Sequence, residues 1–173
     1  MDAPPLKIVL VEDHSLCRSG LTDLLQQRGR MQVAATGNPD VVPDLLRTLQ
    51  PDLLVLDLRM PAMDGLTLLR RLRAAGFETP ALILTMSDAQ EDLAAALRAG
   101  VRGYLLKDME PEDVIAAIAR AARGESNKTI ARALDISHDT VKLHVRHILA
   151  KLNLSSRVEA AVFAVEARAA ASR

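Results

Sequence analysis

Five short apolar runs, each followed by a stretch with helical spacing, fill the first 123 residues of the chain. The runs are KIVLVED at 7–13, QVAAT at 32–36, DLLVLD at 52–57, ALILT at 81–85 and GYLLK at 103–107. The helical stretches cover 16–25, 41–50, 66–75, 91–98 and 114–122, and glycine or proline separates the units. Continuous apolar runs are typical of strands buried on both faces of a parallel sheet. The alternation predicts an α/β fold with a five-stranded, doubly wound parallel sheet and right-handed crossovers.

The composition allows such a fold and excludes several other classes of protein. Of the 173 residues, 49% are hydrophobic but only 2% are aromatic, so the core must be aliphatic. No apolar run approaches the length of a membrane span, and the N-terminus lacks the layout of a signal peptide. Cys17 is the single cysteine, which excludes an internal disulfide and argues against a zinc cluster. We expect a soluble, cytoplasmic protein.

Polar side chains follow four of the five predicted strands. In a doubly wound sheet these positions meet in a crevice at the carboxyl ends of the strands. They are Glu12, Asp13, Asp57, Thr85 and Lys107. Clustered carboxylates favour a cation, and oxygen ligands of this kind suit Mg²⁺. One carboxylate can then attack phosphorus to give an acyl phosphate, while Lys107 neutralises the phosphoryl oxygens and Thr85 donates a hydrogen bond to one of them. The alternative is that each residue is a solvated turn residue or a helix cap.

The last fifty residues have a different character. Residues 1–123 carry 14 Lys+Arg and 17 Asp+Glu, whereas residues 124–173 carry 8 and 5. The pattern of 129–152 predicts a short helix at 129–134, a turn, and a longer helix at 140–152, which is the plan of a helix-turn-helix. Basic residues on the outer face of the second helix can reach the major groove of DNA. An amphipathic helix pair with a solvated basic face would show the same pattern.

The first part of the chain resembles the receiver domain of two-component response regulators. The resemblance is carried by VEDH, LDLRMPAMDG, LTMSD and GYLLKD. It implies a flavodoxin-like fold in which a partner histidine kinase phosphorylates Asp57. It also implies that Mg²⁺ is held by Glu12, Asp13, Asp57 and the backbone carbonyl of Arg59. Thr85 and Tyr104 match the family's switch pair, and Lys107 matches its lysine. Asp108 stands where many receivers have proline.

The tail is similar to the LuxR-type helix-turn-helix that ends regulators of the NarL/FixJ class. The similarity lies in SNKTIA, TVKLHVRHILAKL and the following SR. It implies that double-stranded DNA is bound, with bases contacted by Lys142, Leu143 and Arg146. Residues near phosphates would be Ser126, Asn127, Lys128, Thr140 and Lys151. The last helix, 157–170, would pair with its twin in a homodimer on DNA, and RNA polymerase is a further candidate partner. Within the class, these sequence motifs resemble those of nitrate/nitrite regulators of the NarL type.

The two segments predict a receiver domain at 1–123 and a small all-α helix-turn-helix domain at 124–173. The class usually places a linker and a helix opening LTxRExxVL between them, whereas here VIAAIARAARGE runs directly into SNK. The second domain is therefore expected to lack its linker and first helix. That helix normally packs against the recognition helix, so apolar side chains such as Ile130 and Leu134 would be exposed.

Three functions follow from these patterns. The first is a transcription factor in which phosphorylation of Asp57 releases the helix-turn-helix domain for dimeric, sequence-specific DNA binding. The second is a receiver that acts through protein–protein contact without DNA binding, because the output domain is incomplete. The third is a hydrolase or phosphatase on the same sheet, but such enzymes commonly need a second acid two positions after the aspartyl nucleophile, where this chain has Arg59. We therefore predict a regulator and not an enzyme.

Overall fold

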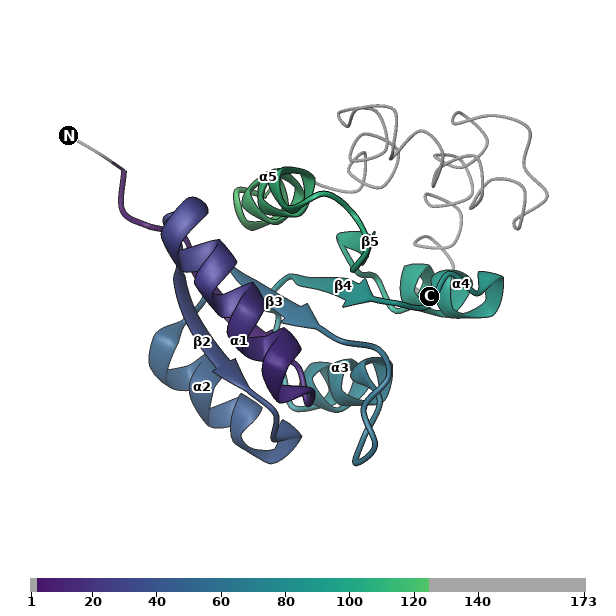
Figure 1. The fold of residues 1–173 in the computed structure, drawn as a ribbon. Coiled ribbons are helices and arrows are strands. Elements are labelled where there is room, and N and C mark those ends of the chain that lie inside the picture. The colour runs from purple at the N-terminus through teal and green to yellow at the C-terminus, as the bar shows by residue number, and fades with distance from the viewer. Residues whose placement is uncertain (1–2, 125–173) are drawn as a thin grey trace.

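The computed structural model describes residues 3–124, so it covers the first predicted domain. The predicted helix-turn-helix, with its proposed DNA-contacting residues and C-terminal helix, lies outside the described residues. Five strands and five α-helices alternate along the described part of the chain (Figure 1).

The strands form one parallel sheet, in the order β2-β1-β3-β4-β5. They are β1 Lys7–Val11, β2 Gln32–Thr36, β3 Leu53–Leu56, β4 Ala81–Thr85 and β5 Gly103–Leu106. All five lie within the predicted apolar runs, and the predicted α/β fold is confirmed. The chain reverses its direction of winding between β1 and β3, so this is the point where a crevice forms at the carboxyl edge.

The helices begin and end close to the expected positions. They are α1 Ser15–Asp23, α2 Val42–Leu49, α3 Gly65–Ala74, α4 Gln90–Arg98 and α5 Pro111–Ala122. A π-helical turn, Leu24–Arg28, continues α1, and a 3-10 turn, Pro39–Val41, leads into α2. Side chains cap two of the helices. His14 accepts a hydrogen bond from the amide of Cys17, and Asp64 accepts one from the amide of Thr67.

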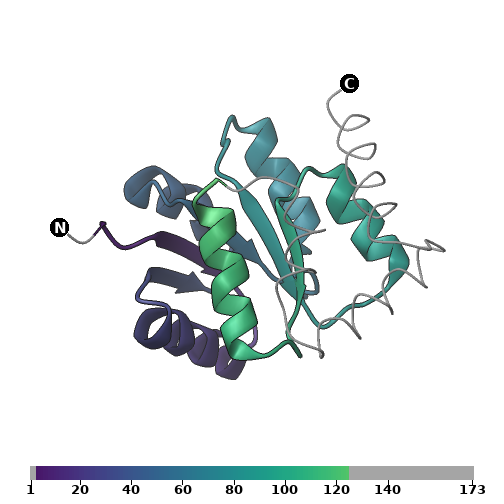
Figure 2. The ribbon, with the colours of Figure 1, turned by 90° about the horizontal axis from the view of Figure 1, so that it is seen from above.

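Two aliphatic layers cover the sheet. The turn after α1 and helix α5 pack on one face, through residues such as Leu25 and Ile118, and α2, α3 and α4 pack on the other (Figures 1 and 2). Leu53–Leu56 of β3 are fully buried because helices cover both faces of this strand. Leu16, in the first turn of α1, is 79% exposed although it is a large apolar residue. Within residues 3–124, every helix is too short or too polar to cross a membrane.

Candidate functional site

Three carboxylates meet where β1 and β3 end. Glu12 and Asp13 follow β1 and Asp57 follows β3, and each offers an oxygen within 4.8 Å of the others. Glu12 and Asp57 are buried, at 1% and 6% exposure. Buried carboxylates repel one another when ionised, and an oxygen-only ligand set of this kind suits a hard divalent cation. The three carboxylates among the four predicted metal ligands are thus brought together, and they can hold a metal ion.

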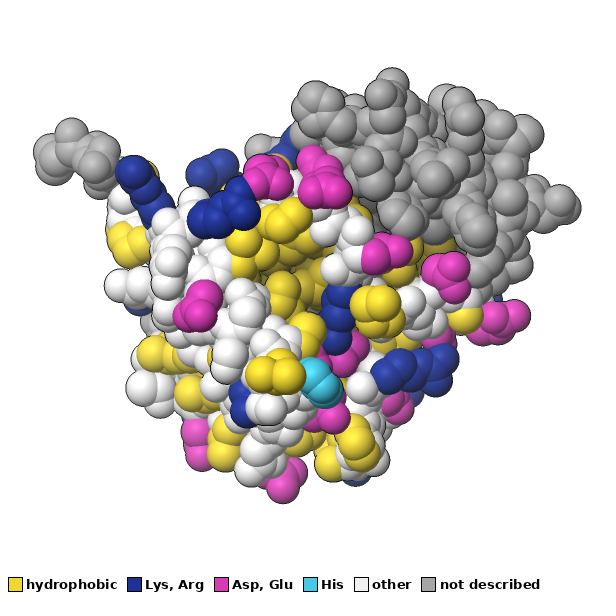
Figure 3. Space-filling view, viewed as in Figure 1, with side chains coloured by type: hydrophobic (Ala, Val, Ile, Leu, Met, Phe, Trp, Pro, Cys, Tyr) yellow, Lys and Arg dark blue, Asp and Glu magenta, His cyan; other side chains and the backbone are white. Residues whose placement is uncertain are grey.

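Lys107 lies among these carboxylates. Its Nζ donates a hydrogen bond to Asp57 Oδ2 at 3.0 Å and forms an ion pair with Glu12. Burial opposes the charge on the amine, but the hydrogen bonds and charges of Glu12 and Asp57 outweigh it, so the pKa of Lys107 is raised above its ordinary value. One ammonium beside three carboxylates leaves an excess of negative charge, which attracts a cation. Figure 3 shows acidic and basic side chains close together on this face of the molecule.

The backbone of the sheet positions these side chains. Hydrogen bonding continues one residue beyond the strands, so each functional residue is held by a neighbouring strand. The bonds run from Glu12 N to Thr36 O at 3.0 Å, from Asp57 N to Val11 O at 2.9 Å, and from Lys107 N to Thr85 O at 2.9 Å. The guanidinium of Arg18 on α1 also donates to the carbonyl of Glu12 at 2.8 Å. The parallel register therefore fixes the order of the charged groups across the crevice.

Gly65 allows the loop after Asp57 to close against that residue. A Cβ at position 65 would lie 2.2 Å from the carbonyl oxygen of Asp57, which a side chain cannot tolerate. The amide of Gly65 donates to the carbonyl of Leu58 at 3.0 Å, and this bond closes the loop. Glycine is therefore required at the first position of α3, because the backbone approaches Asp57 too closely for any other residue.

Thr85 and Tyr104, the predicted switch pair, both contact Ser87. The hydroxyl of Thr85 accepts a hydrogen bond from the amide of Ser87 at 3.2 Å, and the hydroxyl of Tyr104 donates to its carbonyl at 2.7 Å. Thr85 is 1% exposed and Tyr104 is 6% exposed. The tyrosine ring therefore lies in the interior, in contact with the loop between β4 and α4.

Tyr104 is expected to ionise only at high pH. Burial raises its pKa to about 12, the hydrogen bond to Ser87 opposes the rise, and the charge of Asp92 adds to it. Tyr104 is the single tyrosine of the chain, so ultraviolet absorbance reports this phenol alone. A titration by rapid pH jumps, measured before unfolding, should give a midpoint near 12 for the folded chain, against 10.0 for an ordinary phenol. The neutral phenol contributes its full stabilisation of the folded chain below pH 10, and this contribution is lost as the pH rises through 12. A folded-state midpoint near 10 would contradict the buried position.

Sequence patterns missed several residues around the crevice. Ser87 and Asp92 belong to a network that reaches the Arg59 side chain, and Arg18 contacts the backbone of Glu12. Ser87 could have been found as a polar residue just beyond β4, but nothing in the sequence distinguishes Asp92 from its acidic neighbour. Cys17 is partly exposed, and its thiol is near Glu12 and Lys107. Burial raises the pKa of this thiol.

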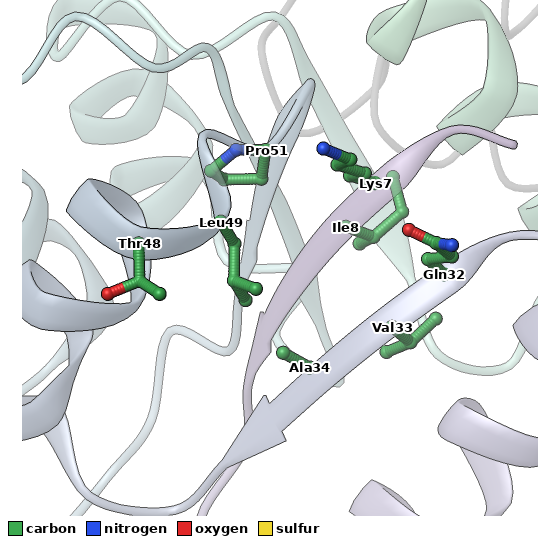
Figure 4. A pocket seen from close by; sticks show the side chains of 8 residues that line it. All are labelled: Lys7, Ile8, Gln32, Val33, Ala34, Thr48, Leu49 and Pro51. Carbon is green, nitrogen blue, oxygen red and sulfur yellow. The ribbon is translucent and has the colours of Figure 1, made fainter. Parts of the chain in front are cut away.

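A second hollow lies away from the carboxylates. It is found beside the first residues of β1 and β2 and the end of α2, and its lining includes Ile8, Val33, Ala34, Leu49 and Pro51 (Figure 4). Lys7 supplies a side-chain charge there, but among residues 3–124 the one group of three metal-ligating side chains is that of Glu12, Asp13 and Asp57. The crevice at the carboxyl edge is therefore the candidate site.

Comparisons with known proteins agree with this geometry. The family model described as response regulator receiver domain matches residues 8–119, and that described as bacterial regulatory proteins, luxR family, matches residues 116–164. The nitrate/nitrite response regulator NarL of Escherichia coli K12 is 35% identical over 209 aligned positions, covering 95% of this chain and 97% of that protein. This chain belongs to the NarL/FixJ class of response regulators.

Other response regulators give the same result. NarP of Escherichia coli K12, also a nitrate/nitrite response regulator, is 35% identical over 212 positions, covering 98% of this chain and 99% of that protein. Among solved structures, a two-component response regulator of the LuxR family from Aurantimonas sp. SI85-9A1 is 30% identical. It has a TM-score of 0.64 and covers 70% of this chain and 87% of that one. Response regulators of this class combine a receiver with a LuxR-type DNA-binding domain, and they are transcription factors and not enzymes.

Proposed function

We propose that a histidine kinase phosphorylates this response regulator on Asp57. The observation that carries the proposal is the position of the Asp57 carboxylate, which is hydrogen-bonded to Lys107 and adjacent to the oxygens of Glu12 and Asp13. An oxygen of Asp57 forms the new bond to phosphorus as the bond from phosphorus to the kinase imidazole nitrogen breaks. That nitrogen keeps the electron pair, and Lys107 neutralises charge on the phosphoryl oxygens.

Mg²⁺ is the cofactor that the donor set fits best. Glu12, Asp13, Asp57 and the backbone carbonyl of Arg59 would hold it, and it would supply further neutralisation of the phosphoryl oxygens. All four ligands are oxygens, and carboxylates with water and phosphate oxygens are the usual environment of this ion.

Phosphorylation would act through Thr85 and Tyr104. A phosphoryl group on Asp57 offers new acceptors to the hydroxyl of Thr85, which now accepts from the amide of Ser87. Moving that hydroxyl changes the loop that also contacts Tyr104. The result is a shift of population between two receiver conformations, and in the second of them the DNA-binding segment is released.

The DNA-binding function rests on the tail. Lys142, Leu143 and Arg146 would contact bases, and the residues near phosphates would be Ser126, Asn127, Lys128, Thr140 and Lys151. The last helix, 157–170, would form a homodimer that binds paired half-sites, with RNA polymerase as a further partner.

The protein would work in the cytoplasm. Because the relatives NarL and NarP are named for nitrate and nitrite, we propose a nitrate/nitrite signal for this regulator as well.

A second candidate is a receiver that acts through protein contact without binding DNA. The alignment to NarL spans 209 positions, more than the 173 residues of this chain, so part of the relative has no counterpart here. The luxR match begins at 116, inside α5, where Ala117, Ile118 and Ala121 are already buried against the sheet. These observations support a receiver at 1–123 followed at 124–173 by a helix-turn-helix domain without its linker and first helix. An incomplete output domain of this kind favours the second candidate.

DNA-binding measurements separate the two candidates. The affinity of the full chain for DNA should be measured with and without acetyl phosphate, over a range of salt concentrations. A DNA-binding regulator is expected to show a steep fall of affinity with salt, because neutralised phosphates release counterions. If Lys142 contacts a base, Lys142→Ala should reduce discrimination between operator and random DNA by about 1–3 kcal/mol. Absence of salt-sensitive binding in both phosphorylation states would favour the protein-contact function.

A further inference from the structure

Asp92 on α4 joins two loops that flank the phosphorylation site. Its Oδ2 lies 2.5 Å from the guanidinium of Arg59, which belongs to the loop after β3. The same oxygen accepts a hydrogen bond from the hydroxyl of Ser87, in the loop after β4. Asp92 is thus the meeting point of a helix and two loops that are far apart in the sequence.

Asp92 is the more buried partner of its ion pair with Arg59. The Asp92 side chain is 18% exposed, whereas the Arg59 side chain is 69% exposed. The amide of Ala89, which precedes α4, donates to the Ser87 hydroxyl at 3.4 Å, so Ser87 also contacts the start of the helix. A carboxylate in the first turn of a helix is favoured by the helix dipole. Glu91 in the same turn has that advantage too, but it is exposed and is not one of the groups that Arg59 and Ser87 contact here.

Both partners of Asp92 continue to residues of the site. The backbone amide of Arg59 lies 3.4 Å from Asp57 Oδ1 and donates to it. Ser87 contacts Thr85 through its amide and Tyr104 through its carbonyl. A displacement of Asp92 would therefore move one residue that contacts the Asp57 carboxylate and another that contacts the switch pair, Thr85 and Tyr104.

We propose that Asp92 is a positioning residue for phosphorylation of Asp57. It holds the loop of Arg59, whose carbonyl is the expected fourth protein ligand of Mg²⁺, and it holds Ser87 where that residue can contact Tyr104. The inference rests on the proposed function, because it assigns a role in a reaction at Asp57. Its basis is the shared oxygen of Asp92, which couples the two loops through one charged group.

The test compares Asp92→Ala with Glu91→Ala in the full chain. Both changes remove a carboxylate from the first turn of α4, and only the first removes the contacts to Arg59 and Ser87. We expect Asp92→Ala to weaken Mg²⁺ binding, measured by calorimetry, and to slow labelling by acetyl phosphate, each by about fivefold, the upper range for a partly exposed ion pair. Glu91→Ala should leave both quantities within twofold of the unsubstituted chain. The fluorescence of Tyr104, the single tyrosine in a chain without tryptophan, should change in Asp92→Ala alone.

A double-substitution cycle separates positioning from folding. Arg59→Ala keeps the backbone carbonyl, so Arg59→Ala and Asp92→Ala should be non-additive in Mg²⁺ affinity if they act through their contact. Equal effects of Asp92→Ala and Glu91→Ala, or full additivity with Arg59→Ala, would overturn the role of Asp92. Failure of the proposed function is distinguishable, because the unsubstituted chain would then not be labelled, or Asp57→Asn would still be labelled.

Discussion

Asp57→Asn is expected to abolish labelling of the full chain by acetyl phosphate. An amide is a far weaker nucleophile than a carboxylate, and no other described carboxylate shares the contact of Asp57 with Lys107 except Glu12, which is more deeply buried. The measurement is the intact mass after incubation with Mg²⁺ and the donor, where one phosphoryl group is expected on the unsubstituted chain and none on the variant.

The control for this variant is Asp23→Asn, at an exposed position at the end of α1. It removes one carboxylate outside the crevice and should be labelled like the unsubstituted chain. Asp57→Asn itself should remain folded, because it relieves repulsion within a group of three carboxylates. Continued labelling of Asp57→Asn would show that another residue is the acceptor.

Lys107→Met is expected to lower the free energy of unfolding by about 3 kcal/mol in the absence of Mg²⁺ at neutral pH. Removing one partner of a buried ion pair leaves the other charge without compensation, which is the costly case for such pairs. Here two carboxylates lose their partner, since Lys107 pairs with both Glu12 and Asp57. The measurement is urea unfolding of the full chain with a chelator present.

Added Mg²⁺ should recover part of the stability lost in Lys107→Met, because the ion supplies the positive charge that the variant lacks. Lys7→Met, at an exposed position at the start of β1, is the matched control and should unfold like the unsubstituted chain. An unfolding free energy of Lys107→Met equal to that of the unsubstituted chain would contradict the importance of the ion pair.

The pH dependence of stability gives a further check on Lys107. Its pKa is raised above the ordinary 10.5, so its contribution is fully present below 10.5 and is lost as pH rises through the raised value. The unsubstituted chain should therefore lose stability above pH 10.5 more steeply than Lys107→Met does. Tyr104 contributes in the same direction in both proteins, so the difference between the two curves isolates the lysine.

Local patterns were enough to predict the strands, the helices and the residues at the strand ends. Glu12, Asp13, Asp57, Thr85 and Lys107 were recognisable because a buried parallel strand is an apolar run, and the polar residue that ends it marks the edge of the sheet. The spacing of apolar residues and the local composition depend only on residues that are near one another in the sequence. Both can therefore be read without knowledge of the folded structure.

The tertiary structure decided what those residues contact. Asp92 and Glu91 are adjacent acids on α4, yet Asp92 alone contacts Arg59 and Ser87, because the rotation of α4 against the sheet turns one of them inward. The close approach of Gly65 to Asp57 likewise depends on how α3 meets the end of β3. The sequence by itself determined the fold class and the chemistry of the crevice, since both follow from local residue pattern. Which side chains meet across helices and loops was decided only by packing, since those contacts join residues far apart in the chain.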